Sequence, residues 1–260
     1  MFKISPIQKI AYASMFLILA ILGTRLPAMF SIPSFEFVRI SLGPAFIILA
    51  GIFLGPLYGA IVGGFSDLLG VVVFPTTLGS IGVINPFITL MYTLMGALSW
   101  VVYFFIKKIK KTNILSISML GVTISLLVFL VIYLLTNDSI TSFGGKVYSF
   151  NLATKMIIIS ISVLLTGGFI VGYIYLNKYF KNRFNELGLD IDFKKVAFIC
   201  FICEIFISLV MGSIVKSIMY QVDFIVLFFI QSIMFFIDIT LNSYIVSLLL
   251  TLLRKIIRKK

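Results

Sequence analysis

The 260-residue sequence contains no histidine, only two cysteines, and only 9 acidic residues against 21 basic ones. Without histidine it lacks the side chain that most often serves as a general base or metal ligand near neutral pH. No GxxxxGK[ST] segment occurs, so the sequence offers no phosphate-binding loop for nucleotide hydrolysis. Cys200 and Cys203 lie inside an apolar run, where packing is their ordinary role and redox or metal chemistry is the alternative. We therefore expect neither enzyme activity nor a cofactor.

What the sequence has in abundance is apolar side chains. They form 61% of the chain, charged residues form 12%, and the mean hydropathy is +1.18, values that exclude a water-soluble domain of this size. Eight apolar windows approach the roughly 20 residues that cross about 30 Å of hydrocarbon. They lie at about 8–26, 40–55, 56–74, 86–106, 114–135, 152–176, 195–218 and 224–253. The sequence predicts an all-α, polytopic membrane protein with about eight transmembrane helices in one domain, residues 1–260.

The basic residues are distributed unevenly between the two sets of helix ends. With the N-terminus in the cytoplasm, sixteen of the twenty-one fall on the cytoplasmic side, as the positive-inside rule requires. The first apolar window follows Lys3 and Lys9 and could be read as a secretory signal peptide, but no small-x-small cleavage site follows it, so we expect a retained helix. Both termini are predicted to be cytoplasmic. The five basic residues on the outer side are Arg25, Arg39, Lys146, Lys155 and Lys216.

Two outer connections are rich in polar and aromatic residues. Residues 27–39 read PAMFSIPSFEFVR, and residues 74–86 read FPTTLGSIGVINP. They could close over a pocket that opens to the exterior, or they could be ordinary connections at headgroup level. The longest polar connection, 177–194, has room for no ATPase domain. An energised transporter would therefore draw on a partner or on an ion gradient.

The front part of the chain resembles a known family. The segments GTRLPAMFSIPS (23–34), FVRIS (37–41), GIFLGPLYGAIVGGFSDLLG (51–70) and FP (74–75) look like the folate-family substrate-binding (S) components of energy-coupling factor (ECF) transporters. The resemblance covers roughly 8–106. It implies that the chain captures a vitamin from outside the cell membrane and delivers it with a transmembrane coupling subunit and two cytoplasmic ATPase subunits.

The chain also departs from this family. Its members usually have six helices, so the pair at 112–177 is a probable insertion, and the last two helices, 195–253, look like the family's last two. Met95 stands where the family has arginine, and Gln231 and Met234 replace a basic pair. Because a folate-like ligand carries two carboxylates, these losses make folate the leading candidate among several small vitamins.

The resemblance and the outer positions together give a set of candidate binding residues. Arg25 and Arg39 are expected to anchor the ligand, although Arg39 could instead reach lipid headgroups or pair with Glu36. Aromatic walls favour a flat heterocycle, and a few polar groups orient it. The remaining predicted substrate-binding residues are Phe37, Phe74, Asn85, Thr89, Tyr92 and Gln231.

Small residues suggest where helices approach closely. Gly51, Gly55, Gly59 and Gly63 recur every four residues, a spacing that suits packing within the chain or against a partner. The family presents an AxxxA pattern on its first helix, but Ser14 and Ile18 occupy these positions here. We predict that Ala13, Ala20, Gly59 and Gly63 form the partner-coupling surface.

Three acidic residues, Asp67, Glu204 and Asp238, lie deep within apolar windows, where a charge is costly. They support an alternative function, a proton- or ion-coupled secondary transporter. Against it, the two halves show no internal repeat and no matching pair of interrupted helices.

Overall fold

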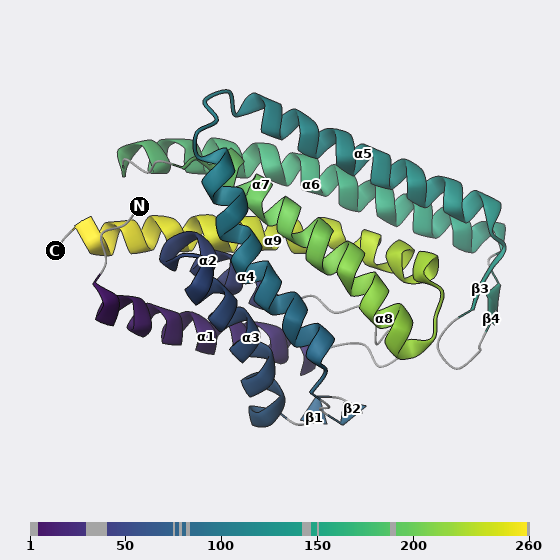
Figure 1. The fold of residues 1–260 in the computed structure, drawn as a ribbon. Helices are drawn as coiled ribbons and strands as arrows, with labels where there is room; N and C mark the ends of the chain where they lie inside the picture. Colours follow the sequence, from purple (N-terminus) through teal and green to yellow (C-terminus); the bar gives the residue numbers. More distant parts are fainter. Residues whose placement is uncertain are drawn as a thin grey trace.

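The computed structural model describes residues 5–29, 41–74, 76–77, 80–81, 84–141, 147–149, 151–187 and 191–258. Its helices run side by side in a bundle, with two short hairpins at one end (Figure 1). The elements in order are α1 (Pro6–Met29), α2 (Gly43–Leu54), α3 (Pro56–Val73), β1 (Thr76–Thr77), β2 (Ser80–Ile81), α4 (Pro86–Ile106), α5 (Asn113–Thr136), β3 (Ser139–Thr141), β4 (Val147–Ser149), α6 (Leu152–Glu186), α7 (Phe193–Cys203), η2 (Glu204–Met211), α8 (Gly212–Tyr220) and α9 (Phe224–Arg258).

Most of these helices are long and apolar enough to cross a bilayer. Within the described ranges, seven segments have the required length and hydropathy, and α7, η2 and α8 form one of them as a continuous rod. The prediction of an all-α multi-pass membrane protein is therefore confirmed. The two strand pairs, β1 with β2 and β3 with β4, are short antiparallel hairpins of two and three residues per strand.

The second predicted span differs from the other seven. Helix α2 has only 12 residues, about 18 Å of helix, and nearly all of its side chains are buried. Its apolar character reflects burial among α1, α3, α4 and α9 and not contact with lipid. Gly55, which follows it, has a φ of 109°, a conformation that favours glycine. This residue and Pro56 end α2 and start α3, as the sequence predicted.

A glycine seam brings α2, α3 and α4 into close contact. A Cβ placed on Gly63 would overlap the backbone carbonyl of Tyr92, and one on Gly96 would overlap the carbonyl of Gly59. A Cβ on Gly51 would overlap Ser99. Only glycine allows these helix backbones to approach so closely.

Successive helices alternate in direction and place most of the described basic residues at one end of the bundle (Figure 1). Lys195 Nζ donates to the carbonyl of Lys107 at 3.1 Å, and Arg254 Nε donates to that of Leu187 at 3.4 Å. The start of α1 and the end of α9 lie at this same end (Figure 1). We call it the basic end, and we call the end that carries both hairpins the opposite end.

The back half packs on an aromatic core and extends further than expected. Helix α6 continues to Glu186, ten residues beyond its predicted end, so the prediction that all of 177–194 is a polar connection was wrong. Phe180 and Phe184 lie in this extension and are almost fully buried. The Phe180 ring stacks on Phe193 with centroids 5.7 Å apart. This apolar stripe keeps the helix intact among polar residues.

Candidate functional site

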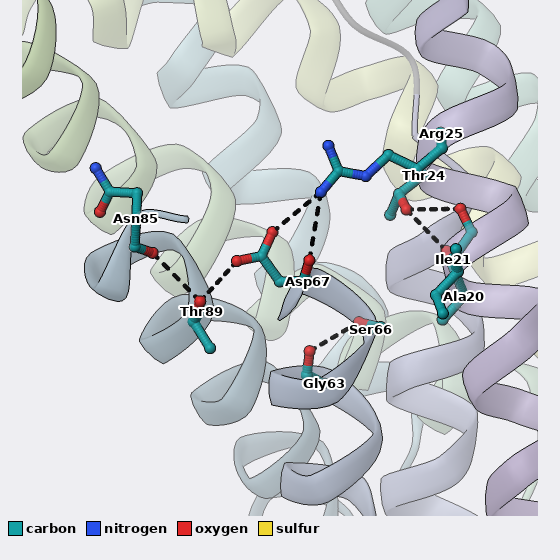
Figure 2. A network of polar contacts seen from close by, with 9 residues as sticks. All are labelled: Ala20, Ile21, Thr24, Arg25, Gly63, Ser66, Asp67, Asn85 and Thr89. Atoms are coloured by element: carbon teal, nitrogen blue, oxygen red, sulfur yellow. Dashed lines mark hydrogen bonds and ion pairs between the residues drawn. The ribbon is translucent and has the colours of Figure 1, made fainter. Parts of the chain in front are cut away.

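A buried polar network lies toward the opposite end, where α1, α3 and α4 meet (Figure 2). Arg25 from α1 and Asp67 from α3 form its centre, with Arg25 Nη2 3.4 Å from Asp67 Oδ1. The same nitrogen lies 3.5 Å from the Asp67 carbonyl oxygen. The side chains are 17% and 7% exposed. Each charge is therefore largely removed from water, and each would be strongly destabilising without its oppositely charged partner.

Helix α4 supplies the other half of the network. The Thr89 hydroxyl donates to Asp67 Oδ2 at 2.7 Å, so both carboxylate oxygens of Asp67 have partners. Asn85 caps α4 by accepting the Phe87 N–H at 2.9 Å, and its carbonyl accepts from Thr89 at 3.3 Å. The amide nitrogen of Asn85 also contacts Met219 Sδ at 3.1 Å. Thr89 thereby orients the Asp67 carboxylate, and Asp67 orients the guanidinium of Arg25.

Arg25 retains donors that Asp67 does not use. Its Nε is buried without a partner in the described part of the chain, and its other terminal nitrogen points away from Asp67 (Figure 2). The guanidinium lies over Gly70, where a Cβ would come within 2.9 Å of Nε. A planar cation held in this way is suited to a carboxylate or another planar anion.

The sequence-predicted binding residues are only partly gathered here. The structure brings Arg25, Asn85 and Thr89 into one network, whereas Phe37 and Arg39 lie outside the described residues. Phe74 is half-buried just after α3, and its N–H donates to the Gly70 carbonyl at 3.0 Å. Tyr92 is also half-buried and packs against the core.

Gln231 makes its polar contacts elsewhere. In the amide orientation that satisfies both of its ends, Nε2 donates to the Ser208 carbonyl at 2.7 Å and Oε1 accepts from Ser213 Oγ at 2.8 Å. Ser208 belongs to η2 and Ser213 to α8. The side chain of Gln231 therefore joins α9 to the π-helical segment.

The residues predicted to couple a partner are occupied within the chain. Ala13 and Ala20 are buried in the core, and Gly59 and Gly63 sit in the seam against α4. These four positions present no exposed face, and their role in the described chain is internal packing. Ser14 and Ile18, by contrast, are exposed on α1.

The other two intramembrane acids lie apart from the Arg25 network. Glu204 begins η2 and accepts a hydrogen bond from Asn242 Nδ2 at 2.7 Å, and Asp238 lies on α9. Sequence reasoning found both acids but missed Asn242 and the π-helix. A polar residue within an apolar run was the available signal for Asn242, whereas no local pattern predicts a π-helix.

A second ion pair lies at the opposite end, between Asp138, outside the membrane spans, and Lys155 in the first turn of α6. Lys155 Nζ lies 2.7 Å from Asp138 Oδ1, and Asp138 is 91% exposed. The hydrogen bond from Lys155 lowers the pKa of the Asp138 carboxyl below its usual range. This pair links the end of α5 to the start of α6, and it has no contact with Arg25.

Comparison with protein-family models, curated proteins and solved structures gives no match for the chain. Among the described residues, no group of three or more His, Cys, Asp or Glu side chains is placed to hold a metal ion. Among the described residues, the Arg25 network combines a buried cation with unused hydrogen-bond donors, which is an arrangement suited to binding an anion.

Proposed function

We propose that the chain is the substrate-capturing S component of an ECF-type vitamin uptake transporter. Its ligand is a small vitamin that carries a carboxylate, with a folate-like molecule as the leading candidate. The observation that carries this proposal is the buried, oriented guanidinium of Arg25, which lies within the family-like part of the sequence. A fixed cation with unused donors is the group that a desolvated carboxylate requires.

The basic residues indicate which end of the bundle faces the cytoplasm. The basic end faces the cytoplasm of the cell membrane under the positive-inside rule, so the Arg25 network faces outward. A transmembrane coupling subunit and two cytoplasmic ATPase subunits supply energy to a chain whose sequence has no phosphate-binding loop. Ser14 and Ile18 are exposed at the positions where the resemblance places the coupling contact, so we assign that contact to this face of α1.

The experiment is equilibrium binding of radiolabelled folic acid to the purified chain without partners. We expect binding at one ligand per chain. We expect Arg25→Ala to weaken it by roughly 10- to 100-fold, because a hydrogen bond to a charged group contributes about 1.5–3 kcal/mol. Arg39→Ala tests the second predicted anchor in the same assay. Lys181→Ala removes an exposed cation near the basic end and serves as the matched control.

Arg25→Ala also leaves Asp67 without its cation, so a loss of binding needs a folded control. The double variant Arg25→Met, Asp67→Leu removes both charges together, and such replacements of buried pairs are often tolerated. A folded double variant that binds folic acid as tightly as the wild type would refute the role of Arg25.

A second candidate function is a proton- or ion-coupled carrier that uses intramembrane acids. The burial of Glu204, only 2% exposed, favours it. Asp67 is committed to Arg25 and Thr89, so an ion relay would be confined to Glu204 and Asp238. Vitamin flux in proteoliposomes that contain no ATPase would select the carrier over the S component.

A further inference from the structure

The continuous helical rod formed by α7, η2 and α8 changes its winding at its centre. Residues Glu204–Met211 form the π-helix η2 between α7 and α8, and α9 packs against it. Short π-helical segments occur frequently at functional sites because the wider turn redirects side chains and carbonyls. The Ser208 carbonyl of this segment is satisfied by Gln231 from α9. The interface between η2 and α9 is therefore a polar layer inside an apolar bundle.

Glu204 is the most deeply buried acid of this layer. Asn242 Nδ2 donates to its Oε1 at 2.7 Å, and the Ser208 side chain donates a second hydrogen bond. Among the described residues, both partners of this carboxylate are neutral groups. Two hydrogen bonds orient a carboxylate but do not neutralise its charge, and at this depth the group requires either a proton or a counter-ion.

Asn242 adds a second, independent observation at the same place. The residue is 0% exposed, and its Oδ1 has no hydrogen-bond partner in the described chain. Because its Nδ2 donates to Glu204, the unused oxygen lies within the same small group of atoms. An amide oxygen that receives no hydrogen bond and a carboxylate are both oxygen ligands, the kind that a hard cation prefers.

Other ionisable groups lie around Glu204 on the neighbouring helices. Asp238 on α9 is close enough for its carboxylate to repel that of Glu204. Lys216 on α8 is close enough to attract the Asp238 carboxylate. Cys200 and Cys203 on α7 also lie near Glu204, and α4 carries no charged residue. A second carboxylate nearby raises the affinity of the site for a cation.

We propose that Glu204 and Asn242 bind a monovalent metal cation of the Na⁺ class, held between the Glu204 carboxylate and Asn242 Oδ1, in competition with a proton. One carboxylate and one neutral amide suit a single charge better than a divalent ion. The site lies apart from the Arg25 network and does not depend on vitamin capture. It would stabilise the π-helical turn against α9 when occupied.

The direct test is equilibrium binding of radioactive sodium to the purified chain, with choline chloride replacing NaCl at constant ionic strength. We expect saturable binding that weakens as the pH falls. Glu204→Gln keeps an oxygen to accept from Asn242 but loses the charge, so we expect at least about a tenfold loss of affinity. Asn242→Leu, which removes the amide oxygen, is expected to weaken binding as well. Asp138→Asn removes an exposed carboxylate of the same chain and should bind like the wild type.

Three results would overturn the proposal. The first is a wild-type chain that binds no sodium, and the second is sodium binding by Glu204→Gln that equals that of the wild type. The third is a melting temperature that responds to pH but not to sodium, which would assign the site to a proton alone. Folic acid binding is measured on the same variants, and its failure would leave the sodium result unaffected.

Discussion

Replacing Asp67 by asparagine tests the buried ion pair that organises the candidate site. The substitution keeps the size of the side chain and leaves an oxygen for the Thr89 hydroxyl, but it removes the negative charge beside Arg25. Coulomb's law at an effective dielectric constant of about 20 gives roughly 5 kcal/mol for unit charges 3.4 Å apart. Removing one partner of a buried pair costs about 3–5 kcal/mol, because the other charge stays buried.

The second ion pair of the chain provides a matched comparison. Asp138 and Lys155 are closer together, at 2.7 Å, but Asp138 is 91% exposed whereas Asp67 is only 7% exposed. The Lys155 side chain is only 10% exposed, but water around the exposed Asp138 carboxylate screens this pair. We therefore expect Asp138→Asn to have little effect on stability, although it removes the charge from the shorter contact. Burial, and not distance, decides the order of the two effects.

The assay is thermal unfolding in detergent, followed by a dye that becomes fluorescent on reaction with thiols. A loss of about 3 kcal/mol corresponds to a fall in Tm of roughly 6–12 °C at about 2–4 °C per kcal/mol. The double variant Arg25→Met, Asp67→Leu should recover most of this loss. Equal Tm values for Asp67→Asn and Asp138→Asn would refute the assignment of Asp67 and Arg25 as a buried, mutually dependent pair.

Further predictions concern the packing of the bundle. Gly96→Ala should destabilise the chain by about 1–3 kcal/mol, because the new methyl group meets the Gly59 carbonyl and forces α3 and α4 apart; Gly168→Ala, where a Cβ has nothing within 4 Å, should not lower Tm. Cys200 and Cys203 are fully buried and unpaired, so both should resist a maleimide in the folded chain and react once it unfolds. Rapid labelling at low temperature would contradict their position in the core.

Much of the fold could be predicted from hydropathy and from proline and glycine. The helix at Pro86–Ile106 was predicted with its observed bounds, because Pro86 starts it and the basic run from Lys107 follows it. Two features of the fold were not predicted from the sequence, because they depend on tertiary contacts. Helix α2 is a buried 12-residue helix although its composition resembled a span, and α6 extends to Glu186 through the buried rings of Phe180 and Phe184.

The candidate site was predictable in part. Arg25, Asn85 and Thr89 were named as ligand groups from the sequence. Asp67 was named only as an intramembrane acid, with a hydrogen bond between helices as its plainer role, and it is the residue that joins Arg25 to Thr89. A pairing 42 residues apart in sequence leaves no local pattern. Gln231 was named as a ligand group because it replaces a basic residue of the family, whereas its contacts are to Ser208 and Ser213.

The central claim is that the Arg25 network captures a vitamin that carries a carboxylate. Mass spectrometry of the intact purified chain, taken from cells supplied with vitamins, tests it most directly. We predict one such small molecule per chain, retained by Lys181→Ala and lost from a folded Arg25→Met, Asp67→Leu double variant. A wild-type chain that carries no small molecule and binds none of the added vitamins would contradict the claim.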